Sequence, residues 1–133
     1  MKMMLKISQI ANKDLRAGHQ IYNYYIINSF SNFEEKKVSY NNFMIKCNNI
    51  KKKKLPYLIA KIENKVVGLA YLDNFREKSG YRFAFENTIY VHNDYLNKGI
   101  GFKLLKQLIT LSKNNKEMKK IVAVISSIES VGS

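Results

Sequence analysis

One stretch of the chain decides the fold: residues 81–101 read YRFAFENTIYVHNDYLNKGIG. Its first half, Tyr81 to Val91, is rich in aromatic and β-branched residues, which predicts a long strand. A turn through His92 to Tyr95 follows, and LNKGIG then opens a helix with one apolar side. Two glycines at a helix start indicate either a cap or tight turn, or a seat for phosphate. Strand, turn and helix together place the N–H groups of Asn97 to Gly101 at a positive helix end, which suits a pyrophosphate.

The composition predicts one globular domain over residues 1–133. Of the 133 residues, 46% are hydrophobic, and a chain of this length buries about two thirds of its unfolded surface. Cys47 is the only cysteine, which excludes a disulfide framework and a cysteine metal cluster, so we expect an ordinary half-buried thiol. The sequence contains neither a bilayer-spanning apolar run nor a cleavable leader. We therefore expect a cytoplasmic protein without a membrane partner.

The net charge of +13 comes from 23 basic residues against 10 acidic residues. Such an excess attracts polyanions and raises the question of nucleic acid. Arginine, which binds phosphate and guanine through paired hydrogen bonds, occurs only at Arg16, Arg76 and Arg82. The lysine excess is better explained by an AT-rich coding bias. The run Lys51 to Lys54 is expected at a helix end, where it meets the negative pole of the helix dipole.

The rest of the pattern predicts a mixed α/β domain without repeats or linkers. Capping residues and apolar spacing predict the helices, and short apolar runs around a polar connector predict an antiparallel hairpin. We expect, in order, a strand at Met4 to Ile7, a helix capped by Asn12 or Asp14, a polar loop from Asn28 to Glu35, a helix capped by Ser39, a hairpin of Tyr57 to Ile62 and Val66 to Leu72, a polar loop from Asp73 to Gly80, the strand and helix quoted above, and a strand at Ile121 to Ile125.

Glu86 is the candidate catalytic residue. It is an acid in the middle of an apolar strand, where a buried and unpaired carboxylate is costly. An edge position or a pair with Arg82 would explain it structurally. The functional alternative is a general base that takes a proton from an amine, directly or through water. His19 is expected on a helix face without a visible partner and His92 as a surface or hydrogen-bonded imidazole, and with no clustered acids we expect no metal site.

Five stretches carry a family resemblance through their order and spacing. They are IYNYYI, SNFEE, LPYLIAKIENKVVGLAYLDNFR, YRFAFENTIYVHNDYLNKGIG and VAVI. In this order they resemble the GNAT acetyltransferase superfamily, and more closely its phosphinothricin N-acetyltransferase-like branch. The resemblance implies an α/β, GNAT-like fold with a mixed, mainly antiparallel sheet flanked by helices.

The resemblance also implies an activity: transfer of the acetyl group of acetyl-CoA to the primary amine of a small amino-acid-like substrate of the phosphinothricin or methionine-sulfone type. Glu86 matches the catalytic base, and a backbone N–H at the strand end would hold the oxyanion. Acetyl-CoA would lie between residues 81–91 and 121–125, bound by Ile89, Tyr90, Val91, Leu96, Asn97, Lys98, Gly99, Ile100 and Gly101. The pocket for the acceptor would be shaped by Phe33, Phe75, Arg76 and Tyr81, with Arg76 facing a carboxylate or phosphinate.

The sequence departs from the family pattern in three places. Leu96 stands where the phosphate loop usually begins with Gln or Arg, and Ser130 stands where the branch carries Asn. Family members continue past the position of Ser133 through another helix and two strands, so we expect a fold that lacks them. The resulting uncovered strand edge and exposed aromatics favour self-association as a homodimer. Two alternatives to an active enzyme stay open: a truncated, inactive remnant and, with less support, a lysine-rich nucleic-acid binder.

Overall fold

The computed structural model describes residues 4–28, 38–74, 84–113 and 120–122. They form β1 (Leu5–Gln9), a short 3-10 helix η1 (Asn12–Asp14), α1 (Leu15–Asn28), α2 (Tyr40–Lys52), β2 (Tyr57–Ile62), β3 (Lys65–Asn74), β4 (Ala84–Val91), a second 3-10 helix η2 (Asn93–Tyr95), α3 (Ile100–Lys113) and β5 (Lys120–Val122). Within these ranges no helix combines the length and the apolar character needed to span a bilayer.

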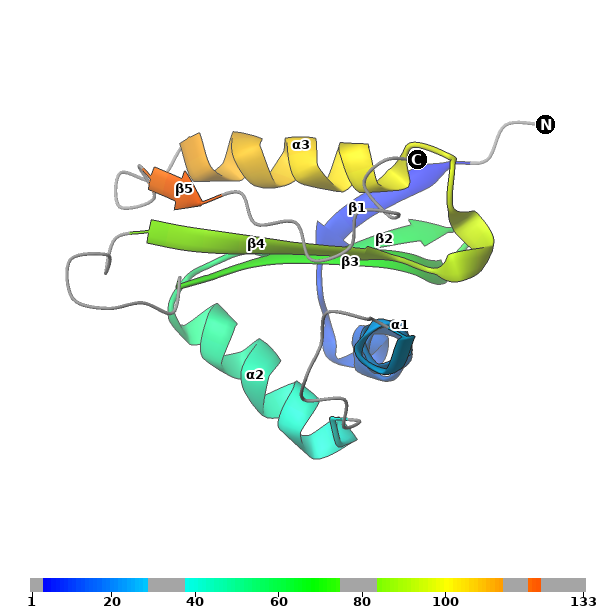
Figure 1. Ribbon diagram of the computed structural model, residues 1–133, viewed down its shortest axis with the longest axis horizontal. Coiled ribbons are helices and arrows are strands. Elements are labelled where there is room, and N and C mark those ends of the chain that lie inside the picture. The colour runs from blue at the N-terminus through cyan, green and yellow to red at the C-terminus, as the bar shows by residue number, and fades with distance from the viewer. Residues whose placement is uncertain (1–3, 29–37, 75–83, 114–119, 123–133) are drawn as a thin grey trace.

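The strands form one sheet in the order β1-β2-β3-β4-β5. The first four strands pair antiparallel, and β5 pairs parallel with β4. Helix α3 covers one face of the sheet, while α1 and α2 lie on the other face (Figure 1). The predicted mixed, mainly antiparallel sheet with flanking helices is therefore confirmed.

The β2–β3 hairpin forms where the sequence predicts it. Its two turn residues, Glu63 and Asn64, have φ values of 51° and 68°. Two successive left-handed residues give a turn whose twist matches the twist of the flanking strands. The hairpin brings β3 to the centre of the sheet, next to β4.

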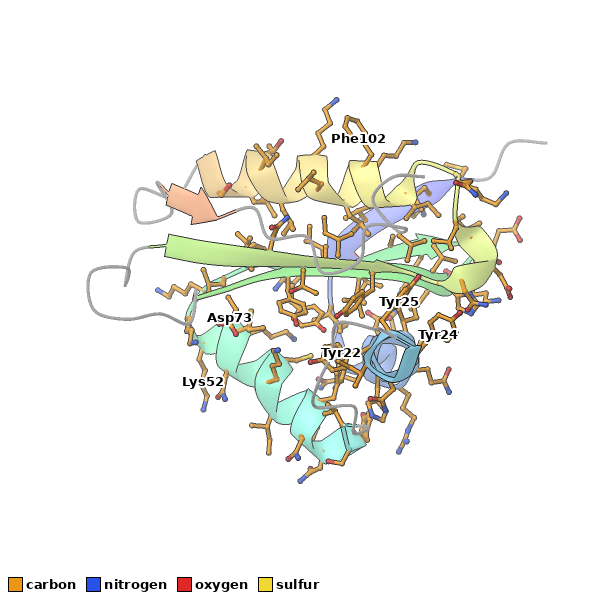
Figure 2. The ribbon with its side chains drawn as sticks, in the orientation of Figure 1. Tyr22, Tyr24, Tyr25, Lys52, Asp73 and Phe102 are labelled. Atoms are coloured by element: carbon orange, nitrogen blue, oxygen red, sulfur yellow. The ribbon has the colours of Figure 1, made fainter. Side chains whose placement is uncertain are left out.

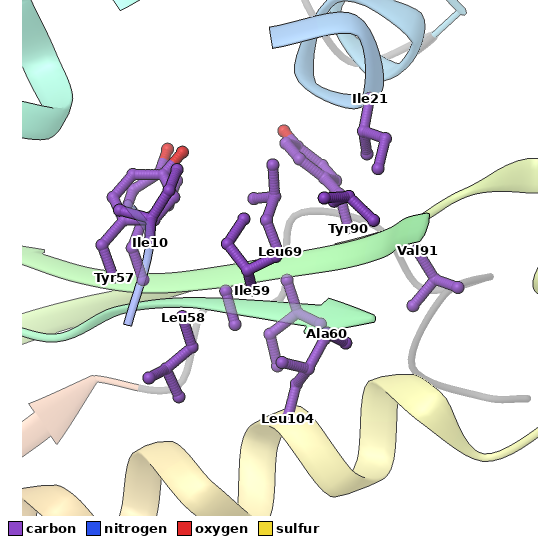
Figure 3. Close-up of a cluster of buried hydrophobic side chains, with 14 of the residues drawn as sticks. Ile10, Ile21, Tyr57, Leu58, Ile59, Ala60, Leu69, Tyr90, Val91 and Leu104 are labelled. Atoms are coloured by element: carbon purple, nitrogen blue, oxygen red, sulfur yellow. The ribbon is translucent and has the colours of Figure 1, made fainter. Parts of the chain in front are cut away.

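Alternation along the strands divides the core into two layers. Tyr57, Ile59 and Tyr90 point toward the α1 side, while Leu58 and Val91 point toward α3 (Figure 3). All five side chains are buried. The sheet is therefore covered by apolar contacts on both faces, as expected for a sheet between two layers of helices.

Gly68 of β3 allows α3 to pack close to the sheet. A Cβ atom at this position would lie 3.2 Å from Leu104 Cδ1 and 3.3 Å from the carbonyl oxygen of Tyr90. Both approaches are tighter than ordinary van der Waals contact. A side chain at Gly68 would push α3 away from β4, the strand that precedes α3 in the chain.

Ser39 caps α2 as predicted, whereas the N-cap of the turn that leads into α1 is Ala11, and Asp14 lies three residues after it. Ser39 Oγ accepts a hydrogen bond from the Asn42 N–H at 3.0 Å at the start of α2. Asp14, which is buried, accepts from the Ala11 N–H at 2.9 Å and forms an ion pair with Lys61 Nζ at 2.8 Å. The start of α1 is therefore tied to β2, which carries Lys61.

Several sequence-based boundaries and environments were wrong. β1 extends to Gln9, because it pairs with β2 along its whole length. Asp73, predicted in a loop, continues β3, where pairing with β4 and an ion pair to Lys53 at 3.1 Å outweigh its low strand propensity. Cys47 is 1% exposed and not half-buried. His19, expected without a partner, contacts the Val38 carbonyl through Nε2 at 2.5 Å.

Other predicted features lie outside the described residues. These are residues 29–35 of the first polar loop, 75–80 of the second, 81–83 at the start of the long strand, and 123–125 at the end of the last strand.

Candidate functional site

The turn between β4 and α3 has the geometry of a helix-terminal anion site. Asn97 and Gly99 have φ values of 65° and 78°, both in the left-handed region. The Gly99 carbonyl accepts from the Lys103 N–H at 3.1 Å, so α3 starts directly after this glycine. A Cβ at Gly99 would meet nothing within 4 Å. The glycine is therefore required by its backbone conformation and not by a lack of space.

The first turn of α3 presents backbone donors. The N–H groups of Ile100, Gly101 and Phe102 precede the first intrahelical donor, Lys103, and have no acceptor within the helix. They lie at the positive pole of a 14-residue helix that has no acidic residue in its first turn. Lys98 is exposed just before them. This arrangement favours a bound anion such as a diphosphate.

His92 shapes the turn that leads into this helix. Its Nδ1 accepts from the Asp94 N–H at 3.0 Å, and its carbonyl accepts from the Tyr95 N–H at 2.8 Å. The expectation of a hydrogen-bonded imidazole is confirmed. The side chain acts as the N-cap of η2 and holds the direction in which the chain leaves β4.

The backbone of β4 presents its two edges to different neighbours. The His92 N–H donates to the Val67 carbonyl at 2.8 Å. Because alternate residues of an antiparallel ladder bond to the same neighbour, the polar groups of Ile89 and Val91 face away from β3. The Val91 carbonyl accepts a hydrogen bond from the Tyr25 hydroxyl. This is the edge at which the resemblance predicts the pantetheine arm.

Tyr25 connects α1 to the end of β4. Its ring stacks on Tyr90, with the centroids 4.8 Å apart and an interplanar angle of 6°. Figure 2 shows Tyr25 between α1 and the sheet, whereas Phe102 points away from the sheet on α3. Sequence reasoning missed the hydrogen bond from Tyr25 to Val91, since nothing local links residues 66 positions apart.

The backbone of Glu86 lies in β4, between Asp73 of β3 and Val122 of β5 in the ladder. Its side chain lies outside the part of the structure that is described, so its role as the base stays a prediction. Four predicted substrate-binding residues also lie outside the described residues: Phe33, Phe75, Arg76 and Tyr81.

A buried polar cluster on the α1 and α2 side of the sheet was missed by sequence reasoning. The Lys46 ammonium of α2 lies 5.0 Å from the ring centroid of Tyr71 and 5.6 Å from that of Tyr22. The Tyr71 hydroxyl forms hydrogen bonds with Lys46 and Thr88, and the Tyr71 ring stacks on Tyr57 at 4.7 Å. One feature of the sequence could have indicated this cluster: Lys46 is a lysine among the buried positions Phe43, Cys47 and Ile50 of α2.

The charges of this cluster follow from its burial. Desolvation raises the pKa of Tyr71 to about 12, so its hydroxyl is neutral at physiological pH. Burial alone would lower the pKa of Lys46, but Tyr71, Tyr22 and the Asp73 carboxylate outweigh that effect and raise the pKa above its usual range. Lys46 is therefore a cation beneath the sheet. Asp73 lies on the same side of β3 as Tyr71 and faces α2 (Figure 2).

A cavity of about 240 Å³ lies between α1 and the adjacent ends of β3 and β4. Its lining includes Tyr24, Tyr25, Lys65 and His92. His92 is six residues beyond Glu86, which at about 3.3 Å per residue puts the cavity about 20 Å along the strand. The cavity is therefore too distant to hold an amine against Glu86. Across the described ranges, no three His, Cys, Asp or Glu side chains are grouped to hold a metal ion.

Comparison with known proteins identifies the family. The sequence pattern of the acetyltransferase (GNAT) family matches residues 18–129. The chain is 32% identical over 100 residues to the phosphinothricin N-acetyltransferase of Alcaligenes faecalis, an alignment that covers 75% of this chain and 51% of that protein. The chain thus spans about half the length of that relative.

Solved structures agree with this family. An N-acetyltransferase from Staphylococcus aureus Mu50 matches with a TM-score of 0.82 and 27% identity, over 90% of this chain and 72% of the other. A GNAT superfamily phosphinothricin acetyltransferase from Sinorhizobium meliloti, in complex with acetyl-CoA, matches with a TM-score of 0.73 and 31% identity, over 84% and 60% of the two chains. The protein described here belongs to the GNAT acetyltransferase family.

Proposed function

We propose that this protein is an acetyl-CoA-dependent N-acetyltransferase that acts on the primary amine of a small amino-acid-like substrate of the phosphinothricin or methionine-sulfone type. The observation that carries this proposal is the anion site at the start of α3, placed directly after the strand whose backbone edge faces away from β3. The relative and the solved neighbour that are phosphinothricin acetyltransferases support the substrate class.

The residues around the α3 start fit the diphosphate of acetyl-CoA. The N–H groups of Ile100, Gly101 and Phe102 have no acceptor within the helix, and the space above Gly99 is open. Leu96 is half-buried and adds no charge or amide, so Lys98 supplies the side-chain cation of this turn. In this proposal Leu96 to Gly101 hold the diphosphate, and backbone groups of Ile89 to Val91 hold the pantetheine arm.

Glu86 is the base in the proposed reaction. It takes a proton from the substrate amine, directly or through a water molecule, and the neutral nitrogen attacks the thioester carbonyl. A backbone N–H at the end of β4 stabilises the oxyanion that forms on that carbonyl oxygen. The attack forms the N–C bond. The C–S bond then breaks as the oxyanion collapses, its electron pair leaves with the CoA sulfur, and the thiolate takes up the proton that the nitrogen loses on becoming the acetamide.

Two further assignments belong to this proposal. Acetyl-CoA is supplied inside the cell, so we place the protein in the cytoplasm. Self-association as a homodimer also stays a prediction, since residues 29–37 and 123–133, on which it was based, lie outside the described residues.

Release of free CoA thiol from acetyl-CoA tests the activity, with a series of amino-acid analogues as acceptors. We expect thiol release that depends on both substrates, and a loss of about 10²–10⁴-fold in kcat for Glu86→Gln. Thermal shift with acetyl-CoA provides a separate readout of binding, because a ligand that binds only the folded state raises Tm. A protein with no thiol release and no shift would refute the proposal, whereas unchanged turnover in Glu86→Gln would remove Glu86 as the base.

A further inference from the structure

The cavity between α1 and the adjacent ends of β3 and β4 has an apolar floor and an entrance from solvent. Ile21 and Val66, which line it, are 4% and 8% exposed. Gln20, Lys65 and Asn93 also line it and are exposed. Buried apolar residues combined with a few polar groups are typical of a small-molecule pocket. The cavity is therefore accessible to a ligand from solution.

The volume of the cavity sets the size of that ligand. At about 240 Å³ it is larger than a cavity of about 150 Å³ that holds benzene in another protein. The space therefore admits one aromatic ring with a short polar substituent. A whole molecule of acetyl-CoA is far too large for it.

Two aromatic side chains of α1 form one wall of the cavity. Tyr24 and Tyr25 both line it, with their ring centroids 5.0 Å apart and an interplanar angle of 85° (Figure 2). The ring of Tyr25 is held in place by stacking on Tyr90 and by the hydrogen bond to the Val91 carbonyl. A ligand ring gains edge or face contacts with such a pair, and a wall that is already ordered lowers the entropy cost of binding.

The opposite wall, formed by the ends of β3 and β4, carries positive charge and N–H donors. The Lys65 ammonium lies 5.3 Å from the ring centroid of Tyr95, and the His92 ring lies 5.7 Å from the same centroid. The His92 Nδ1 accepts from the Asp94 N–H at 3.0 Å, so the neutral ring carries its proton on Nε2, which is a donor. Among the described residues that line the cavity, none is acidic. This wall therefore favours a carboxylate.

We propose that the cavity is a binding site for a small aromatic carboxylate, with the ring against Tyr24 and Tyr25 and the carboxylate at Lys65 and His92. The site lies on the α1 face of the sheet, whereas α3 covers the other face (Figure 1). It is also about 20 Å along the strand from Glu86. The inference goes beyond the proposed function, because neither acetyl-CoA nor the proposed base takes part in it.

Titration calorimetry with three probes of similar shape tests the site: phenylacetate, the neutral phenylacetamide and the cationic 2-phenylethylamine. Lys65→Met removes the charge, and Ala17→Leu fills the cavity from α1, because Ala17 is half-buried in its lining. Lys52→Met is the matched control, since Lys52 is an exposed lysine of α2 that does not line the cavity (Figure 2). Thermal unfolding of each variant verifies that it is folded.

We expect the wild type to bind phenylacetate with a Kd of about 1 mM or lower, to bind phenylacetamide about fivefold more weakly, and not to bind 2-phenylethylamine measurably. Lys65→Met should weaken phenylacetate by about fivefold and change phenylacetamide by less than about twofold. The factor of five corresponds to about 1 kcal/mol, the upper range for an exposed ion pair. Lys52→Met should match the wild type, and Ala17→Leu should lose both ligands.

Three results would overturn the proposal: a wild type that does not bind phenylacetate, equal affinity for the three probes, or a Lys65→Met variant that behaves like Lys52→Met. If Ala17→Leu does not fold, the comparison of the two lysine variants still decides.

Competition with CoA separates this site from the proposed acetyl-CoA site. We expect phenylacetate to bind with CoA present, whereas an apparent Kd that rises in proportion to the CoA concentration would place the probe in the CoA site and refute the proposal. If the protein binds no CoA and acetylates no amine, the proposed function fails. The phenylacetate titrations still decide whether the cavity is a binding site.

Discussion

Replacement of Gly99 by alanine tests whether the turn before α3 depends on its left-handed backbone. Gly99 has a φ of 78°, and a Cβ there would meet nothing within 4 Å. The cost of Gly99→Ala therefore comes from conformation alone, about 1–2 kcal/mol for an L-residue in this region. Reduced freedom of the unfolded chain offsets about 0.5 kcal/mol of that cost. We expect the free energy of unfolding to fall by about 1 kcal/mol.

Urea unfolding measures this change, and a Tm decrease of about 4 °C should accompany it in a domain of this size. Partial relief of the strain rotates the peptide that carries the Ile100 N–H, so we also expect acetyl-CoA to bind up to about tenfold more weakly. That factor corresponds to about 1.4 kcal/mol, less than the loss of one full charge-assisted hydrogen bond. Thermal shift across an acetyl-CoA titration reports this second effect.

Gly99→Asn is the matched control, because asparagine tolerates the left-handed region better than alanine does. It adds a larger side chain but less strain, so we expect it to be more stable than Gly99→Ala and to retain more acetyl-CoA binding. An alanine variant that equals the wild type in both assays would refute the conformational argument. Asparagine that is worse than alanine would show that space, and not φ, constrains this position.

Two further contacts give testable predictions. Burial would raise the pKa of Asp14, but hydrogen bonds from Lys61 and Ala11 outweigh burial and lower this pKa from its usual 3.8. The carboxylate therefore stabilises the fold above about pH 4, and this contribution is lost as the pH falls through the lowered pKa. Lys61→Met should cost about 1.5–3 kcal/mol at pH 7, and this cost should shrink as the pH falls through the lowered pKa of Asp14, measured by urea unfolding across an acid pH series; a cost that does not change with pH would contradict the ion-pair explanation. Tyr25→Phe removes the hydroxyl that donates to Val91 at the strand end, and should cost about 0.5–1.5 kcal/mol of stability and raise KM for acetyl-CoA with little change in kcat. An unchanged KM would show that this hydrogen bond serves only the fold.

Local signals account for the parts of the fold that the sequence predicts well. Ser39 caps α2 and the Glu63-Asn64 turn closes the hairpin, and both act within a few residues of the structure they define. Gly99 likewise sets the start of α3 through its own backbone conformation. The strand, the turn and the candidate anion site were therefore predictable together, because all their determinants are neighbours in the chain.

Errors arose where distant segments outweighed local preference. The polar residues Asp73 and Asn74 predict a loop, but their pairing with Glu86 and Phe85 keeps them in β3. His19 is expected without a visible partner, yet Asn23 of the same helix lies 2.9 Å from its Nε2 and the fold brings the Val38 carbonyl to it. The pairing of Asp73 with Glu86 and the contact of His19 with Val38 join residues that are distant in the sequence.

The sequence by itself determined the element order, the hairpin, the Ser39 cap of α2 and the glycine turn, because these depend on short-range steric preferences and hydrogen bonds. Only the tertiary structure decided that Lys46 lies beneath Tyr71, that Tyr25 reaches the Val91 carbonyl, and that the ladder sets Asp73 beside Glu86. These contacts depend on how α1 and α2 dock on one face of the sheet. Docking is governed by shape and burial summed over many residues, which a local pattern does not contain.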